Sequence, residues 1–400
     1  MQTFKYTARD TSTNKVIKST ISAQSESEAA KLLMAQKIVP TKLESIDTRR
    51  GFASLNARVS TKDRVIFTRQ LATMINAGLP LAQSLNTVQE QTSNKALKNI
   101  IGEIANNVNS GASLADSFAK HPKVFNQVYL ALVKAGEASG TLDQSLERLA
   151  KQQEHDADMM SKIRGAMMYP AIVLAVIVGV VVFMLLMLVP QVQNLYDDMG
   201  RELPLQTRIL TSVANFVIDY WYIVLLVSIG VIFLLRRWIQ TDSGRKAWDT
   251  FKLNMPLFST LFRKLYMARF SRTCETLLGS GVPMLESLKI SADATNNVVV
   301  REQILRGADK VKNGKALSEG LTGEDYILPF VPQMVKIGET SGGIDSMLGK
   351  VADYYEKEVD NTIKSISTLI EPILMVIMAG LIGFIVLAVL LPIYALSDSV

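Results

Sequence analysis

The sequence has very little of what catalytic and metal-binding proteins commonly use. It contains one cysteine, Cys274, and two histidines, His121 and His155, in 400 residues. One cysteine excludes an intramolecular disulfide, and so few sulfur and imidazole groups exclude a Cys/His metal centre. Charged residues are also scarce, at 20% of the chain, whereas hydrophobic residues make up 48%. This apolar surplus predicts segments that lie outside water.

Catalytic and phosphate-binding motifs are missing as well. The sequence contains no HExxH, no GxSxG and no dinucleotide fingerprint. Its closest approach to a phosphate loop is GGIDSMLGKV, where Ile344 replaces the first glycine and Val351 replaces the hydroxyl that would hold magnesium. The net charge of +6 comes without a basic patch interleaved with aromatic residues, so no nucleic acid is expected. We predict a protein that is not an enzyme and binds no cofactor or metal.

Three apolar runs are long enough to cross a membrane. Residues 171–189 carry no charge, and as a helix they reach about 28 Å, close to the roughly 30 Å of a hydrocarbon core. The second run includes one acid, Asp219, which is followed by three aromatic residues and is therefore interpreted as a water boundary rather than a proton relay. The predicted transmembrane helices are 169–190, 213–235 and 371–396.

Basic residues at the ends of these runs predict the orientation, because lysine and arginine near span ends prefer the cytoplasm. The amino terminus lacks the basic-then-apolar pattern of a cleavable signal, so Met1 is expected to begin the mature chain with its amino end inside. The basic residues lie before the first span (Lys162, Arg164), after the second (Arg236, Arg237) and before the third (Lys357, Lys364).

The chain also contains an internal repeat. The segment at 67–85 returns at 270–288 with seven identities in 19 positions, at a constant offset of 203. After one deletion the offset becomes 202, which aligns KAGEASGTLDQSL with KIGETSGGIDSML and Pro170 with Pro372. Each copy is therefore predicted to be a cytoplasmic helical domain followed by a membrane helix. The unpaired second span returns the chain to the cytoplasm between them.

The predicted fold is mainly α: a polytopic membrane protein with three transmembrane helices and two duplicated cytoplasmic helical-bundle domains, plus a small N-terminal α+β module. Amphipathic spacing of apolar residues supports the bundles, and the segment STKD at 60–63 fits a capping box at the start of the first one. Strand-like alternation around a turn at 11–14, followed by a helical segment SESEAAKLLMAQK and a short strand, supports the module. The remaining predicted ranges are 1–46 (α+β module), 47–59 (linker), 60–168 (first bundle), 191–212 (outward loop), 236–262 (cytoplasmic connection), 263–370 (second bundle) and 397–400 (outward tail).

Two kinds of turn recur in both copies. The first combines a glycine that can leave a helix with a proline that starts the next one, which predicts tight helix–helix turns. The second is GExSG, whose glutamate could cap a helix, bind a cation or meet a basic partner. The turn residues are Gly78, Pro80, Gly281 and Pro283 in the first kind, and Gly136, Glu137, Gly140, Gly338, Glu339 and Gly342 in the second.

We predict partner binding at all six residues of the two GExSG turns, and in particular through Glu137 and Glu339, because an exposed turn has no packing reason to keep an acid in both diverged copies. The turn glycines in this prediction are Gly136, Gly140, Gly338 and Gly342. Arg69 and Arg272 also occupy matched positions, and a repeated arginine in a bundle helix is predicted to be a structural carboxylate clamp. Matched prolines before the spans, at 170 and 372, suit a first helical turn or a kink.

Together these segments resemble the PilC/GspF family of polytopic inner-membrane platform proteins from type IV pilus and type II secretion machines. The likeness covers nearly the whole chain. It lies in the AGLPL and SGVPM turns, in VFNQVYLALVKAGEASGTLDQSLERLA and KIGETSGGIDSMLGKVADYYEKEVD, in the loop GRELPLQTRIL, and in the closing LIEPILMVIMAGLIGFIVLAVLLPIYAL. The sequence departs from the family in the N-terminal module, where residues such as Asn14 replace glycines of the first hairpin.

The resemblance implies a platform in the bacterial inner membrane. Such a platform binds a hexameric cytoplasmic assembly ATPase, other inner-membrane assembly proteins and the membrane helices of pilin or pseudopilin subunits. Type IV pilus biogenesis is favoured, type II secretion is the alternative, and a membrane transporter is a distant one. Small residues spaced four apart, Ala175 with Gly179 and Ala379 with Gly383, further predict a homo-oligomer in the lipid bilayer.

The basic-residue asymmetry predicts a testable topology, with residues 1 to 168 and 236 to 370 inside and Val400 outside. An enzymatic reporter that works only on the outer side of the membrane is expected to be active when fused after Val400. The same reporter inserted after Asp242 is expected to be inactive. Activity at both sites, or at neither, would contradict the predicted number of spans.

Overall fold

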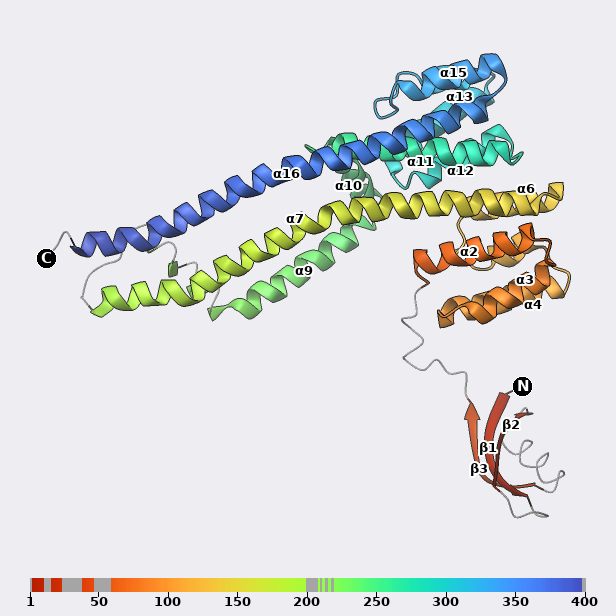
Figure 1. Ribbon diagram of the computed structural model, residues 1–400, viewed down its shortest axis with the longest axis horizontal. Helices are drawn as coiled ribbons and strands as arrows, with labels where there is room; N and C mark the ends of the chain where they lie inside the picture. Colours follow the sequence, from red (N-terminus) through yellow and green to blue (C-terminus); the bar gives the residue numbers. More distant parts are fainter. Residues whose placement is uncertain are drawn as a thin grey trace. The chain divides into compact units, whose positions relative to one another are not determined.

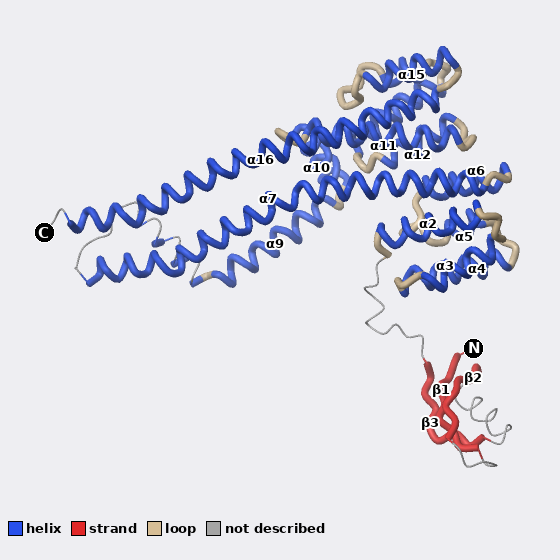
Figure 2. Tube along the Cα trace, viewed as in Figure 1, coloured by secondary structure: helices blue, strands red, loops and turns tan. Residues whose placement is uncertain are grey.

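The computed structural model describes residues 2–10, 16–23, 38–46, 59–198, 208, 211–212, 215–216 and 219–397. Helices make up nearly all of the described part after residue 59, and strands are found only before it (Figures 1 and 2).

The N-terminal strands form one antiparallel sheet. They are β1 (Gln2–Asp10), β2 (Val16–Ala23) and β3 (Ile38–Ile46), in the spatial order β2-β1-β3. The register pairs Phe4 with Ile21 across β1 and β2, and β1 and β3 are irregular between Thr7 and Ala8. The strands cover the segments in which alternation predicted them. The turn at 11–15 and the predicted helix between β2 and β3 lie outside the described residues.

The first repeat is a bundle of short helices followed by one very long helix. A capping box starts it, as the sequence indicated: the Asp63 backbone N–H donates to Ser60 Oγ at 3.1 Å, and the Ser60 N–H donates to the Asp63 carboxylate at 3.3 Å. The elements are α2 (Thr61–Asn76), α3 (Leu81–Gln91), α4 (Lys95–Asn109), α5 (Leu114–Ala119), α6 (Gln127–Ser139) and α7 (Leu142–Asp198).

The second repeat has the same order of helices. Its elements are α11 (Ser259–Gly279), α12 (Met284–Ala294), α13 (Val298–Lys312), α14 (Leu317–Leu321), α15 (Phe330–Ser341) and α16 (Ile344–Ser397). Two helices precede them, α9 (Trp221–Ile239) and α10 (Asp242–Asn254). The predicted connection 236–262 is thus largely helical. It belongs to the second bundle, because the buried Asp249 of α10 accepts a hydrogen bond from the Val298 N–H at 3.0 Å and so caps α13.

The two bundles fill matched core positions with different side chains. In the first, the rings of Phe67, Phe118, Phe125 and Tyr129 are buried and contact one another in edge-to-face and tilted pairs, with the ring centroids of Phe118 and Phe125 4.4 Å apart. The matched positions in the second bundle are buried too and are mostly aliphatic: Phe270, Leu321, Ile327 and Val331. One backbone arrangement is therefore stabilised by two cores of different composition.

Each long helix continues from its bundle into an apolar segment without a break. Helix α7 has 57 residues and α16 has 54, so they extend about 85 and 81 Å at 1.5 Å per residue. Pro170 and Pro372 lie inside these helices, so the prediction that they could occupy a first helical turn is wrong. The predicted boundaries at 168/169 and 370/371 do not coincide with helix ends.

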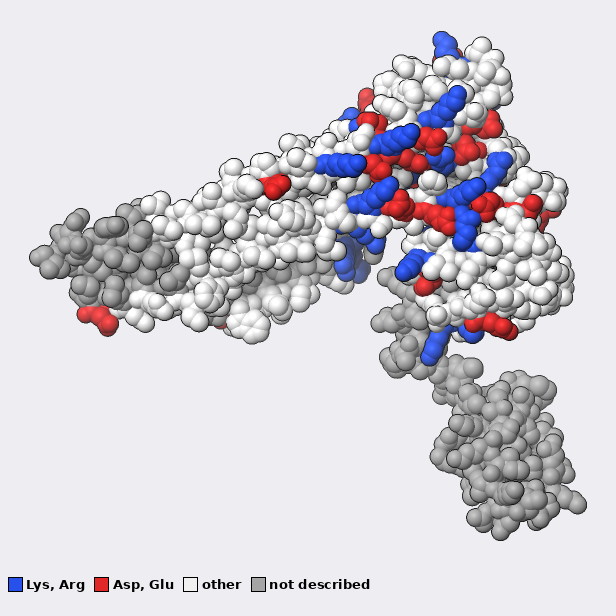
Figure 3. Space-filling view, in the orientation of Figure 1, with Lys and Arg blue, Asp and Glu red and all other residues white. Residues whose placement is uncertain are grey.

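Three helices, α7, α9 and α16, are long and apolar enough to span a membrane. Helix α9 begins at Trp221 and ends at Ile239, so it extends four residues beyond the predicted second span, and Asp219 precedes it. Figure 3 shows the charged side chains gathered on the bundles, while the described surface of the apolar helices is almost free of them. This distribution agrees with a hydrocarbon environment for the apolar helices and water around the bundles.

Candidate functional site

The GExSG turns link a short helix to each long helix with the same backbone geometry. In the first repeat, α6 ends at Gly140 with φ +71°, and the Thr141 N–H donates to the Gly136 carbonyl at 2.9 Å. In the second, α15 ends at Gly342 with φ +76°, and the Gly343 N–H donates to the Gly338 carbonyl at 3.0 Å. A left-handed residue at this position is the usual way to end a helix, and glycine adopts it without strain.

The first glycine of each motif has a different role, which is close packing. A Cβ on Gly136 would lie 2.7 Å from Ser145 Cβ, and one on Gly338 would lie 2.7 Å from Ile344 Cα. These distances are shorter than real Cβ contacts, so the short helix can touch the start of the long helix only because glycine stands there.

The glutamate of each motif caps a neighbouring short helix. Glu137 accepts from the backbone N–H groups of Leu114 at 2.5 Å and Ala115 at 2.9 Å, at the start of α5. Glu339 accepts from the Leu317 N–H at 2.5 Å and from the Ser318 hydroxyl at 2.5 Å, at the start of α14. A carboxylate at a helix amino end satisfies unpaired N–H groups and complements the helix dipole.

This geometry corrects one premise of the sequence analysis. Glu137 and Glu339 are half-buried, and each has a clear structural reason to recur in both copies. The statement that an exposed turn lacks such a reason is therefore wrong. The carboxylates of both glutamates already accept hydrogen bonds within the bundle. Contact of these two glutamates with a basic partner stays a prediction.

The matched arginines hold the first helix of each bundle to the long helix. Arg69 of α2 donates to Glu154 at 2.6 Å and to Glu147 at 2.7 Å, both on α7. Arg272 of α11 donates through Nε and Nη2 to both oxygens of Glu356 on α16, at 2.9 and 3.0 Å. Glu154 and Glu356 are separated by the repeat offset of 202, so the planar two-bond pairing is itself duplicated.

The electrostatics of the first clamp follow from these bonds. The hydrogen bond to Glu154 is the main cause that raises the pKa of Arg69, and Arg69 in turn lowers the pKa of Glu147 and Glu154. Carboxylates whose pKa is lowered on folding stabilise the fold above their ordinary pKa. That contribution is lost as the pH falls through the lowered pKa of the folded state.

The glycine–proline turns close the hairpins at the start of each bundle. Gly78 has φ +82° and Gly281 has φ +83°, and Pro80 and Pro283 are the residues directly before α3 and α12. In both copies the glycine ends one helix in the left-handed region and the proline begins the next. The tight turns expected from the sequence are therefore present.

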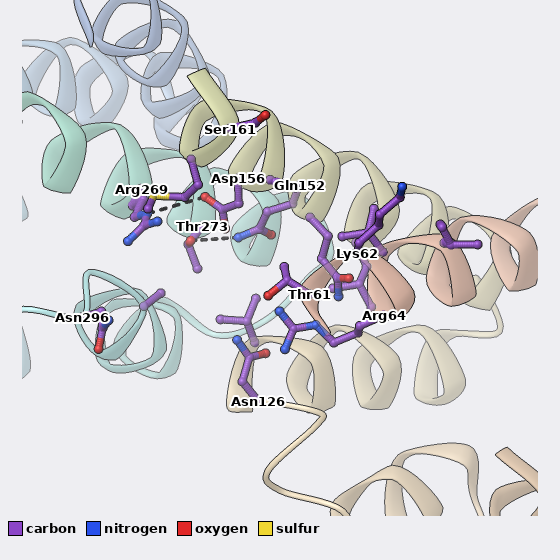
Figure 4. A pocket seen from close by; sticks show the side chains of 18 of the residues that line it. Thr61, Lys62, Arg64, Asn126, Gln152, Asp156, Ser161, Arg269, Thr273 and Asn296 are labelled. Carbon is purple, nitrogen blue, oxygen red and sulfur yellow. Dashed lines mark hydrogen bonds and ion pairs between the residues drawn. The ribbon is translucent and has the colours of Figure 1, made fainter. Parts of the chain in front are cut away.

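Between the repeats lies a polar cleft of about 850 Å³ that sequence reasoning missed. Figure 4 shows side chains from both copies facing one another across it. Gln152 of α7 donates to Thr273 Oγ1 of α11 at 2.8 Å, and Asp156 lies 3.7 Å from Arg269 Nε. The matched position of Gln152 is Tyr354, so comparing the two copies gave no signal for this contact. Within the described residues, no group of three or more His, Cys, Asp and Glu side chains could hold a metal ion.

Comparison with known proteins identifies related chains along the whole length. The family described as type II secretion system (T2SS), protein F, matches residues 67–190 and 270–392, which are the two repeats. The family described as its N-terminal domain matches residues 1–44. The matched segments of the duplicated domain end within the long helices α7 and α16, so the family's unit includes both bundle and span.

Curated relatives cover nearly the full chain. A type IV pilus assembly protein PilC from Thermus thermophilus is 37% identical over 404 residues, spanning 100% of this chain and 99% of the relative. A protein of the same name from Pseudomonas aeruginosa is 35% identical over 372 residues, 92% of this chain and 98% of the relative. A type II secretion system protein F from Pseudomonas aeruginosa is 32% identical over 405 residues, 100% of both chains.

The close packing at the turns generates a stability prediction. Gly136→Ala and Gly338→Ala are each expected to destabilise the fold by about 1–3 kcal/mol, the usual cost of overpacking. Gly165→Ala is the matched control, because this glycine of α7 has open space around it and alanine favours a helix. Thermal unfolding of the purified chain in detergent measures the difference. Equal midpoints for all three variants would show that the short helices have room to move away.

Proposed function

This chain belongs to the type II secretion system protein F family, and we propose that it is an inner-membrane platform protein of type IV pilus assembly. In this role it binds a hexameric ATPase on the cytoplasmic side and couples the motion of that ATPase to the insertion of pilin subunits into a growing filament. Other inner-membrane assembly proteins are further proposed partners. Relatives named for type IV pilus assembly and for type II secretion both align over most of this chain, and the first listed among them support the pilus.

The observation that carries this proposal is the continuity of α7 and α16. Each begins at a GExSG turn and continues through a bundle into an apolar span (Figure 1). From Leu142 to Pro170 the helix covers about 42 Å. A displacement at the turn therefore has a direct mechanical route to the membrane, because a hydrogen-bonded helix moves as a unit more readily than a jointed chain.

Three duplicated contacts support this route. The close glycine packing joins the short helix to the long one, the glutamate cap joins the short helix to the next, and the arginine clamp joins the first helix of the bundle to the long helix. The glycine packing and the arginine clamp reach α7 or α16 directly, and the glutamate cap is connected to them through α6 or α15. A partner that moves the bundle would therefore move the long helix with it.

The finer arrangement is part of the proposal. The amino terminus and both bundles lie in the cytoplasm and the carboxyl terminus lies outside, on the basis of the lysine and arginine distribution. The sheet β1–β3 belongs to a small α+β module at 1–46, and 47–59 is a linker. The small-residue pairs in the first and third spans support a homo-oligomer.

Two alternatives differ in chemistry. A transporter needs a polar path between spans, whereas the apolar windows of α7, α9 and α16 bury few residues against one another in the described part of the chain. An ATPase needs a loop around phosphate, whereas Gly349 and Lys350 lie inside the helix α16. Neither activity is proposed.

Deletion of the gene in its native host tests the assignment. Loss of surface pili with normal protein secretion is expected, and complementation should restore the pili. Loss of secretion with normal piliation would instead favour the type II secretion alternative.

Interrupting α7 tests the mechanical route. Ser161 is exposed and lies between the bundle and the apolar run, and Ser161→Pro would remove a backbone hydrogen bond and cost about 3 kcal/mol of helix stability. Pilus assembly is expected to fall at least tenfold while the chain still inserts into the membrane, whereas Ser161→Ala should assemble pili normally. Full assembly by the proline variant would show that coupling does not use a continuous α7.

The roles of Glu137 and Glu339 are separated by measuring stability and binding on the same variants. Glu137→Gln keeps an acceptor oxygen but loses the charge, so the cap predicts a loss of about 1 kcal/mol. Glu137→Lys is expected to lose more stability because it places a cation at a helix amino end. If the turn also meets a basic surface, both variants should bind the cognate assembly ATPase several-fold more weakly. A lowered melting temperature with unchanged affinity would leave these glutamates as caps alone.

A further inference from the structure

The two repeats contact each other through different surfaces. Helices α11 and α12 of the second repeat pack on α6 and α7 of the first, and α7 also packs along α16. In Figure 1, α7 lies between α2 on one side and α11 on the other. Among the described residues, α2 and α3 do not pack in the same way against α15 and α16. The contact is therefore heterologous, which means that the two repeats use different surfaces in it. Each repeat thus has a second surface, matched to the one that the other repeat uses, which this contact does not involve.

Within the chain, this contact buries polar side chains. Gln152 is 6% exposed and Thr273 is 2% exposed, and they share the hydrogen bond across the repeats. The Arg148 guanidinium lies so close to Gly279 that a Cβ there would meet it at 2.2 Å. Val282, at the start of the α12 hairpin, is buried as well.

The unused surface on the first repeat consists of the residues matched to Arg269, Thr273 and Val282. They are Ile66, Gln70 and Leu79, and we call them the outer α2 face. Ile66 is 44% exposed and also lines the cleft between the repeats. Leu79 is 38% exposed, although Val282, its matched residue, is buried.

The unused surface on the second repeat lies on α15 and α16, which match α6 and α7. Two exposed apolar residues on it are Ile337, matched to Ala135 of α6, and Tyr354, matched to Gln152, and we call them the outer α16 face. Ile337 is 53% exposed and Tyr354 is 46% exposed. Ile337 and Tyr354 are large and apolar, whereas the matched residues in the first repeat are alanine and glutamine. The large apolar side chains thus lie on the repeat whose surface has no partner within the chain.

The outer α2 face and the outer α16 face match, position by position, the two surfaces that contact each other within the chain. Helices α7 and α16 run side by side in the same direction (Figures 1 and 2). Repeating the relation between the repeats would place the membrane helices of a second copy in that same direction, so both copies would fit in one bilayer. The outer faces expose the apolar side chains of Ile66, Leu79, Ile337 and Tyr354, and exposed large apolar side chains are common in protein interfaces.

We propose that a second copy of this chain docks by repeating the internal contact between molecules. The outer α2 face of one copy lies on the outer α16 face of the next, and Gln70 faces Tyr354 as Thr273 faces Gln152 within one chain. This inference builds on the homo-oligomer proposed above and gives it a specific cytoplasmic interface. Because the contact is head to tail, it can extend to further copies or close into a ring.

Cysteine crosslinking in membranes of the full chain tests the predicted register. A glutamine side chain separates the two backbones of the internal pair, so a short bismaleimide is suitable where a direct disulfide is not. The double variant Gln70→Cys with Tyr354→Cys is expected to form crosslinked dimers and larger species. The native Cys274 should not interfere, because burial raises the pKa of its thiol to about 12 and keeps it protonated.

Three controls make the result specific. Gln152→Cys with Thr273→Cys should crosslink within one chain, which confirms that the internal contact is formed. Gln70→Cys with Glu319→Cys should give no dimers, because the exposed Glu319 on α14 lies outside the outer α16 face. Ile66→Glu should lower the dimer yield of the Gln70/Tyr354 pair at least tenfold, whereas Leu285→Glu, at another exposed leucine, should leave it unchanged.

An internal crosslink without dimers from the Gln70/Tyr354 pair would overturn this interface, and so would equal dimer yields from the Glu319 pair. If native mass measurements in detergent still showed oligomers, contact through the spans would remain and only the cytoplasmic interface would be wrong. If the outer faces instead crosslinked to a different protein, that protein would occupy them, and docking of a second copy would be wrong.

Discussion

The structure depends on one constraint, the need of a backbone in hydrocarbon to satisfy its own hydrogen bonds. A helix meets that need, and in α7 and α16 the helix that contains the apolar segment also forms the last helix of a bundle. Bundle and span therefore share one hydrogen-bond ladder. The bundle cannot rotate about a flexible joint at the membrane surface, and whatever orients the bundle also orients the span.

In each bundle, shorter helices that come earlier in the chain pack onto the long helix. The glycine turn folds a short helix onto the start of the long one, and the arginine clamp brings the first helix of the bundle onto its side. These contacts are polar or depend on the absence of a Cβ, so they are specific in geometry. The cores between them are less specific, since aromatic rings in one copy and aliphatic chains in the other support the same helices.

Duplication has produced two bundles with the same architecture but different surroundings. The first presents its α6 and α7 surface to the second, and the second presents α11 and α12 to the first. Positions that match in the alignment therefore differ in burial, as Gln152 and Tyr354 show. The polar pair in the internal contact, Gln152 and Thr273, matches Tyr354 and Gln70 in the other copy, so matched positions carry different chemistry.

The sequence by itself determined the number of membrane spans, the duplication, the glycine–proline turns and the capping box at Ser60. These features are local: a charge-free run of sufficient length, a repeated spacing, or a cap within four residues specifies its own conformation. It also indicated arginine clamps without naming their carboxylate partners, since Arg69 and Glu154 are 85 residues apart. For Pro170 and Pro372 the sequence left a first helical turn or a kink, and the first helical turn is wrong because both prolines lie inside long helices.

Only the tertiary structure decided what Glu137 and Glu339 do and how the repeats meet. The caps join residues about twenty positions apart on helices whose relative position depends on the whole bundle. The contact between Gln152 and Thr273 joins positions 121 residues apart, and their matched residues, Tyr354 and Gln70, are of different types. Side-chain pairs of this kind arise from packing between helices, and packing depends on the complete three-dimensional arrangement rather than on any pattern within one segment.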